Sequence, residues 1–168
     1  MGKINIEKLS NHYIVRKITE DDVDDIIAIM QGNPLFYEYT DARPTRDDLK
    51  RDMTALPNGK SIEDKYYIGF FDDNELIAVM DLIDGYPDED TAFIGFFMMA
   101  PKEQGKGTGS RIIEEVSKTL KDAGFTRTRL AINKGNPQSS SFWKKNGFES
   151  LREVERQDGT VILAEKIL

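Results

Sequence analysis

The chain has 168 residues, of which 39% are hydrophobic and 32% charged, so it is long enough to bury a core without disulfides or bound metal. Its 23 Lys and Arg face 30 Asp and Glu, and the net charge of −7 disfavours nucleic acid and anionic membranes as partners. Cysteine is absent and His12 is the one histidine, which excludes cysteine nucleophiles and thiolate or His-rich metal sites and disfavours a Ser-His-Asp triad.

The organisation of the chain is that of one domain over residues 1–168, because no repeat, low-complexity tract or linker interrupts it. Residues 1–11 are polar and lack the apolar run of a signal peptide. No window approaches the ~18 apolar residues of a membrane span. A chain without cysteine suits a reducing compartment, so we expect a cytoplasmic protein.

The first third of the chain predicts a strand and two helices. Residues 13–18 read as a short strand. Thr19 is a helix cap, and apolar residues at helical spacing predict a helix over 20–31, which Gly32-Asn33-Pro34 ends. Thr45 predicts the cap of the second helix.

The middle of the chain predicts three strands, over residues 66–71, 76–83 and 91–99. Short turns join them, so we expect an antiparallel meander. The third strand is apolar on both faces, which places it inside the sheet.

The remaining elements alternate between helix and strand before a final hairpin. They are a helix over 110–123, a strand over 128–133, a helix that begins at Asn136, and strands over 150–156 and 161–167 joined at Asp158-Gly159. Helix-linked strands are usually parallel neighbours. The predicted order is βααβββαβαββ, an α+β fold with a mixed, mostly antiparallel central sheet flanked by helices.

A glycine-rich loop precedes the 110–123 helix, with the sequence Gln104-Gly105-Lys106-Gly107-Thr108-Gly109. Its glycines allow the backbone N–H groups to approach a ligand, and the helix start adds a positive dipole end. We expect an anion site here, most naturally for a pyrophosphate, with Lys106 and Arg111 adding charge. The loop lacks the Gly-Lys-Ser/Thr ending of a Walker motif and the βαβ setting of a dinucleotide fingerprint.

The loop, read with the strand before it, resembles the acetyl-CoA signature of the GNAT N-acetyltransferase superfamily. Gln104, Gly107 and Gly109 fit the pattern of Gln or Arg, two residues, Gly, one residue, Gly or Ala. The segment from Asn136 to Gly147-Phe148 is similar to the family's cofactor-side helix. The resemblance is clear over residues 92–148, and the order of elements extends it over nearly the whole chain.

The resemblance implies acetyl-CoA as cofactor, CoA as product, and no metal. In the family the pantetheine arm lies between the splayed fourth and fifth strands and pairs with the fourth strand's backbone. The cofactor-binding residues implied for this chain are Met98, Met99, Ala100, Gln104, Gly105, Lys106, Gly107, Thr108, Gly109, Ser110, Asn136, Ser139 and Trp143.

The chain departs from the family at the residues that move protons. Trp143 stands where the family often has a Tyr acid, and indole has no usable titration, so we expect it to position the cofactor near the sulfur. Residues 92–94 hold no Glu to serve as the base. Asp81, a carboxylate in mid-strand, is the alternative base, with an ion pair or a solvent-facing position as its other interpretation.

The expected activity is acetyl transfer to a primary amine, by direct attack within a ternary complex. The net charge favours a small cationic acceptor, and residues 20–58 should shape its pocket. Tyr37, Tyr39 and Tyr86 are candidates for lining that pocket, or for packing alone. The alternative function is a non-catalytic CoA-binding sensor of the same fold. The expected partner is the amine, with no nucleic acid or membrane, and a homodimer is left open.

Overall fold

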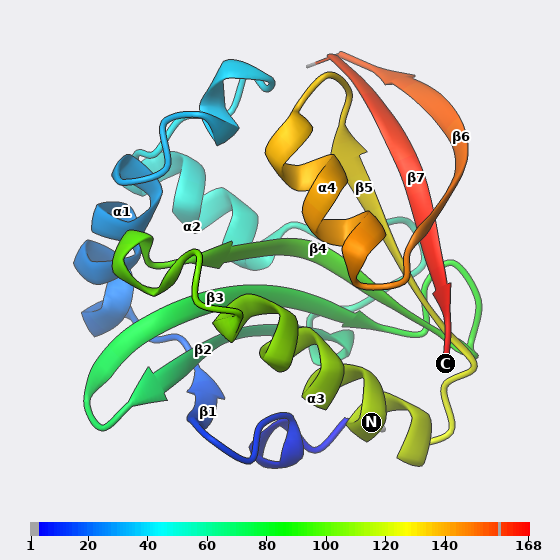
Figure 1. The fold of residues 1–168 in the computed structure, drawn as a ribbon, viewed down its shortest axis with the longest axis horizontal. Helices are drawn as coiled ribbons and strands as arrows, with labels where there is room; N and C mark the ends of the chain where they lie inside the picture. Colours follow the sequence, from blue (N-terminus) through cyan, green and yellow to red (C-terminus); the bar gives the residue numbers. More distant parts are fainter. Residues whose placement is uncertain (1–3, 158) are drawn as a thin grey trace.

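The computed structural model describes residues 4–157 and 159–168, so the start of the polar N-terminal segment and Asp158 of the expected hairpin turn lie outside the described residues. Seven strands form one sheet in the order β1-β2-β3-β4-β5-β7-β6 (Figure 1). The strands are β1 (Ile14–Lys17), β2 (Lys65–Asp72), β3 (Glu75–Asp84), β4 (Thr91–Met99), β5 (Arg127–Asn133), β6 (Glu149–Arg156) and β7 (Gly159–Ile167). The α-helices are α1 (Val23–Gln31), α2 (Arg46–Thr54), α3 (Thr108–Asp122) and α4 (Pro137–Lys145).

The predicted order of elements and the α+β class are both confirmed. The first helix differs in one detail, because Thr19 caps a 3-10 turn, Glu20–Asp22, that leads into α1. The Thr19 backbone N–H donates to the Asp22 carboxylate at 2.8 Å, and Arg16 binds the same carboxylate at 2.8 and 2.9 Å. The acidic helix start is therefore held in place by its own hydrogen bonds.

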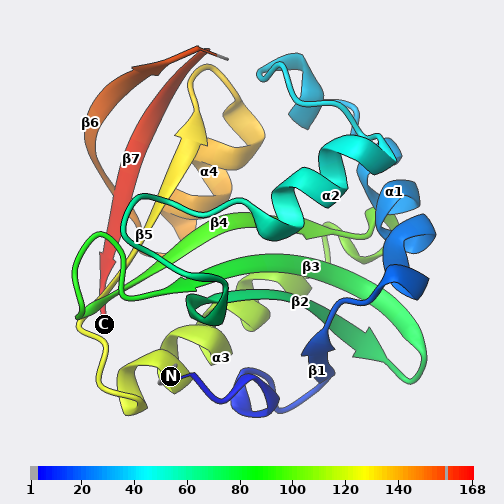
Figure 2. The same ribbon diagram turned by 180° about the vertical axis from the view of Figure 1, so that it is seen from behind.

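Helices cover both faces of the sheet. Helices α3 and α4 lie on the face seen in Figure 1, and α1 and α2 lie on the opposite face, seen in Figure 2. Apolar residues at helical spacing bury one side of α3 against the first face, and Val23 and Ile26 of α1 pack with Leu49 of α2 on the second. No helix among the described residues has the length and apolar character needed to cross a bilayer.

The centre of the sheet opens between β4 and β5. Strands β2, β3 and β4 are antiparallel, as expected, whereas β4 and β5 are parallel and pair only between Thr91–Ile94 and Arg127–Leu130. Gly95 is an extra residue in β4, because Asp81 pairs with Phe96 and Leu82 with Ile94. This bulge turns the second half of β4 away from β5.

Helices α3 and α4 end in the same type of glycine C-cap. The Phe125 N–H donates to the Leu120 carbonyl at 3.1 Å after α3, and the Phe148 N–H donates to the Trp143 carbonyl at 3.0 Å after α4. In each case a glycine with positive φ precedes the phenylalanine, which returns into the core. The predicted Gly-Phe helix ends are confirmed.

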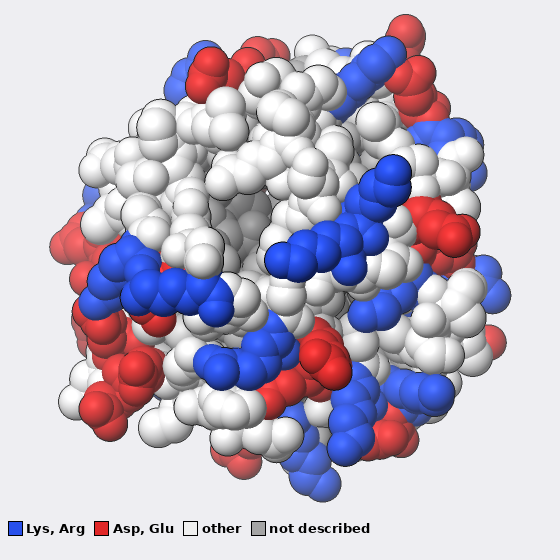
Figure 3. All heavy atoms as spheres, viewed as in Figure 1, with Lys and Arg blue, Asp and Glu red and all other residues white. Residues whose placement is uncertain are grey.

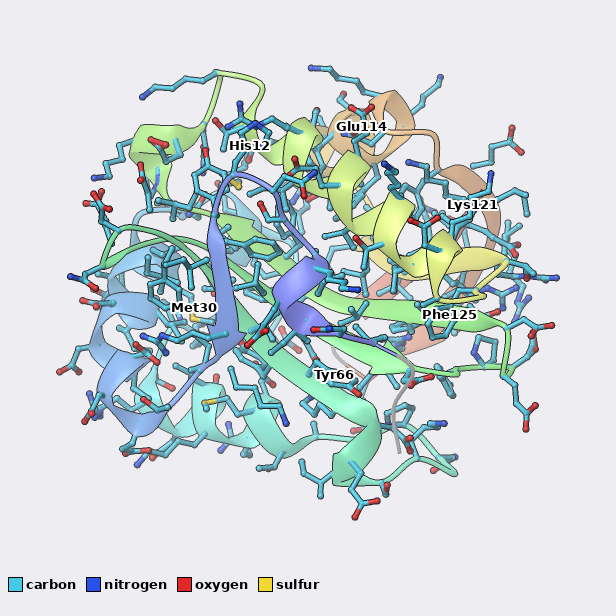
Figure 4. All side chains as sticks on the ribbon, turned by 90° about the horizontal axis from the view of Figure 1, so that it is seen from below. His12, Met30, Tyr66, Glu114, Lys121 and Phe125 are labelled. Atoms are coloured by element: carbon cyan, nitrogen blue, oxygen red, sulfur yellow. The ribbon has the colours of Figure 1, made fainter. Side chains whose placement is uncertain are left out.

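The N-terminal segment lies alongside α3 (Figure 4), and its Ile4 and Leu9 belong to the core cluster that this helix covers. His12, which is half-exposed, contacts Glu115 of α3 with its Nδ1 atom 2.7 Å from the carboxylate, and Ser10 donates to the same carboxylate at 3.0 Å. Hydrogen bonds from Ser10, Asn11 and His12 lower the pKa of Glu115 against the opposing effect of burial. His12 therefore connects the N-terminal segment to α3 and lies away from the opening between β4 and β5.

The two edges of the sheet are short or irregular. Strand β1 has four residues, and β6 has a bulge between Ser150 and Arg152 where its pairing with β7 shifts. Nearly every residue of β6 is exposed, and five of its eight residues are charged.

Candidate active site

A cavity of about 300 Å³ lies where β4 leaves β5, between the glycine-rich loop and α4. Figure 3 shows this face hollowed between α4 and the side of α1 and α2, with Lys and Arg side chains along the rim. The cavity is lined by Asn33, Phe36, Phe97, Met98, Met99, Glu103, Gln104, Gly105, Gly107, Gly109, Ser110, Asn136, Gln138, Ser139, Phe142, Trp143 and Lys145.

The start of α3 presents uncapped N–H groups at one end of this cavity, the geometry that an anion site needs. Gly107 has a φ of 80° and precedes the helix without any side-chain cap, so the first N–H groups of α3 have no capping partner. Gly105 has a φ of 76°, and a Cβ at either glycine would meet no atom within 4 Å. The left-handed turn therefore requires these two glycines, and the space beside them is open. Their N–H groups and the helix dipole fit a pyrophosphate.

The third glycine of the loop, Gly109, lines the cavity as expected and also has a packing contact that the sequence does not suggest. A Cβ at Gly109 would lie 3.1 Å from the Phe142 ring of α4. Gly109 therefore permits close packing of α3 against α4, and this packing sets the width of the cavity between them.

The side chain of Gln104 is directed into the protein. Its amide donates to Asn33 Oδ1 at 2.6 Å and to the Met99 carbonyl at 3.2 Å. The Asn33 amide in turn donates to the Met99 carbonyl at 3.1 Å and to the Ile29 carbonyl at 2.8 Å. The end of α1, the end of β4 and the glycine-rich loop are thus tied together by two amide side chains.

Helix α4 forms the other wall. Asn136 is 1% exposed, and its side chain accepts from the N–H groups of Gln138 at 3.1 Å and Ser139 at 3.2 Å, as predicted for a helix cap. Trp143 is 8% exposed and forms an aromatic cluster with the rings of Phe97, Phe142 and Phe148. It is both a core aromatic and part of the cavity wall.

A second cavity of about 190 Å³ adjoins the first and reaches toward α2. Phe36, Phe97, Ser139 and Trp143 line both cavities. The lining of this cavity also includes Asp52 of α2, Tyr37 of the 36–38 turn, Gly95 and Phe96 of β4, Asn133 of β5, Arg156 of β6 and Val161 of β7. The shared residues place the two cavities end to end across the β4 bulge.

Asp81 lies beneath the floor of the second cavity, in a buried ion pair. Lys65 Nζ is 3.0 Å from Asp81 Oδ2 and 2.7 Å from the Ala55 carbonyl oxygen, and the Lys65 and Asp81 side chains are 2% and 13% exposed. A Cβ at Gly95 would lie 2.6 Å from Asp81 Oδ2, so the bulge glycine makes room for this carboxylate. Asp81 Oδ1 is buried and has no hydrogen-bond partner among the described residues.

Burial raises the pKa of Asp81 and of several ionisable groups near it. Burial raises the pKa of Asp81, although Lys65 opposes the shift. Burial also raises the pKa of Asp52, which is exposed by area but surrounded on one side by protein. The pKa of Tyr37 rises to about 12, and the pKa of Tyr67 rises well above its ordinary value, through burial first and nearby carboxylates second.

The structure gathers most of the residues that the sequence suggests for cofactor binding into the first cavity. Ala100, Lys106 and Thr108 do not line it: the Ala100 N–H donates to Ile77 at 2.8 Å, Lys106 is exposed beside Glu103, and Thr108 is buried. Tyr37 lines the second cavity, whereas Tyr86 packs on Phe93.

Sequence reasoning misses Asn33, Phe36 and Phe97 in the first cavity and Asp52 in the second. In the sequence Asn33 is only part of a helix stop, and Asp52 is only one of many charges on a helix. No local pattern distinguishes either residue, because each reaches its cavity only through tertiary packing.

The comparisons with known proteins agree with this geometry. Residues 24–148 match the Acetyltransferase (GNAT) family, so the chain belongs to that family. The chain is 23% identical over 160 residues to spermidine N(1)-acetyltransferase of Thermoplasma acidophilum, covering 90% of this chain and 95% of that protein.

Solved structures share the fold. An acetyltransferase from Thermus thermophilus has a TM-score of 0.73 at 20% identity, covering 100% of both chains. The PaiA N-acetyltransferase of Thermoplasma acidophilum in complex with coenzyme A has a TM-score of 0.65 at 21% identity, covering 92% of this chain and 98% of that one. The protein is thus a GNAT acetyltransferase, and its family implies acetyl-CoA as the acyl donor.

Proposed function

We propose that the chain transfers an acetyl group from acetyl-CoA to a primary amine of a small cationic acceptor, by direct attack in a ternary complex. The observation that carries the proposal is that the two cavities adjoin at Phe97 and Trp143, which line both of them. A donor in the first cavity and an acceptor in the second would meet beside these two residues. The spermidine acetyltransferase relative supports an amine acceptor. Holding both reactants in contact is itself a large part of the catalysis.

In this proposal the cofactor is held mainly by backbone groups. The N–H groups at the start of α3 bind its pyrophosphate, and the free edge of β4 at Met98 lies along its arm. Ser110, Asn136 and Ser139 line the same side. Acetyl-CoA supplies the acyl group as a thioester, whose thiolate is a fair leaving group because thiol pKa values lie near ~8.5. Trp143 positions this end of the cofactor without acting as an acid.

Asp81 is proposed as the proton acceptor. An alkylammonium has a pKa near ~10.4, so at neutral pH the acceptor must lose a proton before it attacks. Asp81 Oδ1 is free of partners among the described residues, and the carboxylate lies against Gly95, which faces the second cavity. A water beside Gly95 would carry the proton to the carboxylate, whose Oδ2 is the oxygen nearest Gly95. Burial makes this carboxylate a stronger base than an ordinary Asp.

The test is release of free thiol from acetyl-CoA over a panel of amines, alkyl diamines, amino acids and peptide amines, with thermal shift by CoA measured in parallel. Acetylation of a cationic amine with a CoA-induced rise in Tm is the expected result. A rise in Tm with no thiol release from any amine would instead favour the non-catalytic CoA sensor. Efficient turnover confined to neutral or anionic acceptors would contradict the cationic acceptor.

A further inference from the structure

The end of α4 meets the start of α3 at one end of the first cavity. Asn146, the C-cap of α4, donates through its side-chain amide to the Ser110 hydroxyl at 3.2 Å and to the Phe142 carbonyl at 2.8 Å. Ser110 lies in the first turn of α3 and lines the cavity. One side chain therefore joins the two helices beside the N–H groups that lack a capping partner.

The chemistry of these groups fixes the direction of each hydrogen bond. A carbonyl only accepts, so the Asn146 atom that lies 2.8 Å from the Phe142 carbonyl is the amide nitrogen. An amide nitrogen only donates, so Ser110 Oγ is the acceptor in the second bond. The hydroxyl proton of Ser110 is then directed away from Asn146. Within residues 4–157 and 159–168, this hydroxyl donates to no atom.

Asn146 also occupies carbonyl groups that would otherwise repel a phosphate, because the last carbonyls of a helix form the negative end of its dipole. The Phe142 carbonyl accepts from the Asn146 side chain and, at 3.2 Å, from its backbone N–H. The Trp143 carbonyl accepts from the N–H groups of Asn146 at 3.1 Å and Phe148 at 3.0 Å. Lys145 lines the cavity and forms no ion pair with a described residue. An uncapped donor end, a capped acceptor end and an unpaired ammonium together suit an anion.

We propose that Asn146 is a positioning residue for the phosphate end of the cofactor. By donating to Ser110 Oγ, it turns the hydroxyl proton toward the cavity, where Ser110 donates a hydrogen bond to a phosphate oxygen of CoA. This inference rests on the proposed function, because it needs CoA in the first cavity. Asn146 itself touches no cofactor atom in this arrangement and acts through Ser110.

The competing interpretation is that Asn146 is a helix cap and nothing more. Its bond to the Phe142 carbonyl would satisfy that role alone. Loss of a cap loosens the end of α4 as a whole, so it should weaken every ligand of the cavity alike. A positioning role through Ser110 should affect only ligands that carry phosphate. Pantetheine, which is the thiol arm of CoA without the nucleotide and its phosphates, separates the two interpretations.

The fluorescence of Trp143, the single tryptophan and part of the cavity wall, can report the Kd of CoA and of pantetheine. Ser110→Ala should weaken CoA about tenfold or more, the size of one hydrogen bond to a charged group, and Asn146→Ala about threefold. Neither variant should change the Kd for pantetheine. Ser141→Ala, at an exposed position on α4, is the matched control and should leave both ligands unaffected.

The double variant tests whether Asn146 acts through Ser110. When Ser110 is already alanine, Asn146→Ala should weaken CoA no further, because the hydroxyl that it orients is gone. Additive losses, an unchanged Kd for CoA in Asn146→Ala, or an equal loss of pantetheine affinity would each overturn the inference and leave the proposed function intact. Absence of CoA binding by the unsubstituted protein would contradict the proposed function and this inference with it.

Asn146→Asp keeps the inference testable if Asn146→Ala does not fold. It preserves the size of the side chain but replaces the donor with an acceptor, so the Ser110 proton should turn toward the carboxylate and away from the cavity. CoA should then bind at least as weakly as in Ser110→Ala, and the loss should shrink when Ser110 is already alanine. An equal loss in both backgrounds would show that the added charge acts alone, and would overturn the role assigned to Asn146.

Discussion

The two ends of the site are built from different materials. The cofactor end consists mostly of backbone: the N–H groups at the start of α3, the unpaired half of β4, and the glycine turn at Gly105 and Gly107. The proposed acceptor end depends on side chains: Asp52 of α2 lines it, and the Lys65–Asp81 ion pair lies against it at Gly95. A backbone site depends on conformation and tolerates side-chain changes, whereas a side-chain site changes its specificity with single residues.

The strongest test of this contrast is Gly107→Asp, which places a carboxylate beside the N–H groups of α3. At a ligand concentration of ~100 times Kd, CoA should stabilise the native protein by about 2.7 kcal/mol, a Tm rise of roughly 5–10 °C. The variant should lose this rise. Gly124→Asp is the control, because Gly124 also has positive φ and open space but lies beyond the far end of α3. A full shift in folded Gly107→Asp would show that the loop is not the phosphate site.

The next largest effect is expected at the acceptor end, from Asp81→Asn. General-base catalysis is typically worth ~10²–10⁴-fold, so kcat at saturating acetyl-CoA should fall at least ~100-fold. The Kd for CoA should change little, because the carboxylate lies under the other cavity. A fall of less than about tenfold, or a matching loss of folded protein, would return Asp81 to a structural role as the partner of Lys65.

The pH dependence follows from the same carboxylate. Burial raises the pKa of Asp81, so this group takes up a proton, and kcat falls, at a higher pH than the ~3.9 of an ordinary Asp. Lys65 holds that pKa down, so Lys65→Gln should move the acid limb of the kcat profile to higher pH. The raised pKa also means that ionised Asp81 costs stability, which is regained as pH falls through its native pKa. An acid limb unmoved in Lys65→Gln would contradict the pairing.

A smaller effect is expected where the two ends are tied together, at Asn33. Asn33→Ala removes the acceptor of the Gln104 amide and one donor to the Met99 carbonyl. Each hydrogen bond is worth about 1 kcal/mol, so KM for acetyl-CoA should rise about fivefold or more. Asn58→Ala, on an exposed turn, is the control and should leave KM unchanged. If both variants behave alike, Asn33 is no more than the end of α1.

The smallest change is expected from Trp143→Phe, which keeps an aromatic ring among Phe97, Phe142 and Phe148. The lost indole area should raise KM for acetyl-CoA a few-fold, while the pH–rate profile keeps its shape. Disappearance of an alkaline limb in this variant would contradict the view that Trp143 positions the cofactor without acting as an acid.

The local backbone features around the proposed cofactor cavity are predicted well from the sequence, because each involves only neighbouring residues. Glycines with positive φ, the Asn136 cap and the Gly-Phe helix ends each act over a few neighbouring residues, so a short pattern specifies each of them. The order of strands follows from the turns and helices between them. Even there the pattern is incomplete, because the close approach of Gly109 to the ring of Phe142 has no signature in the loop itself.

The acceptor end resists prediction because its contacts join distant parts of the chain. Lys65 and Asp81 form an ion pair between neighbouring strands, and Asp52 lines the second cavity from α2. Asp81 is visible in the sequence only as a carboxylate in an apolar strand. Neither its ion pair nor the room made for it by Gly95 has a local signature, since the register of β3 and β4 creates both.

The two edge strands of the sheet, β1 and β6, affect whether another copy of the protein can add to it. An exposed strand edge is a template for adding another strand, and proteins protect such edges with short strands, charges and bulges. Here β1 offers only four residues, and β6 carries a bulge beside Ser150 with charged side chains along it. Both edges therefore oppose end-to-end growth of the sheet at high concentration. A second copy that extended the sheet would have to pair with β1 or β6, the two edges of the strand order, and both disfavour such pairing.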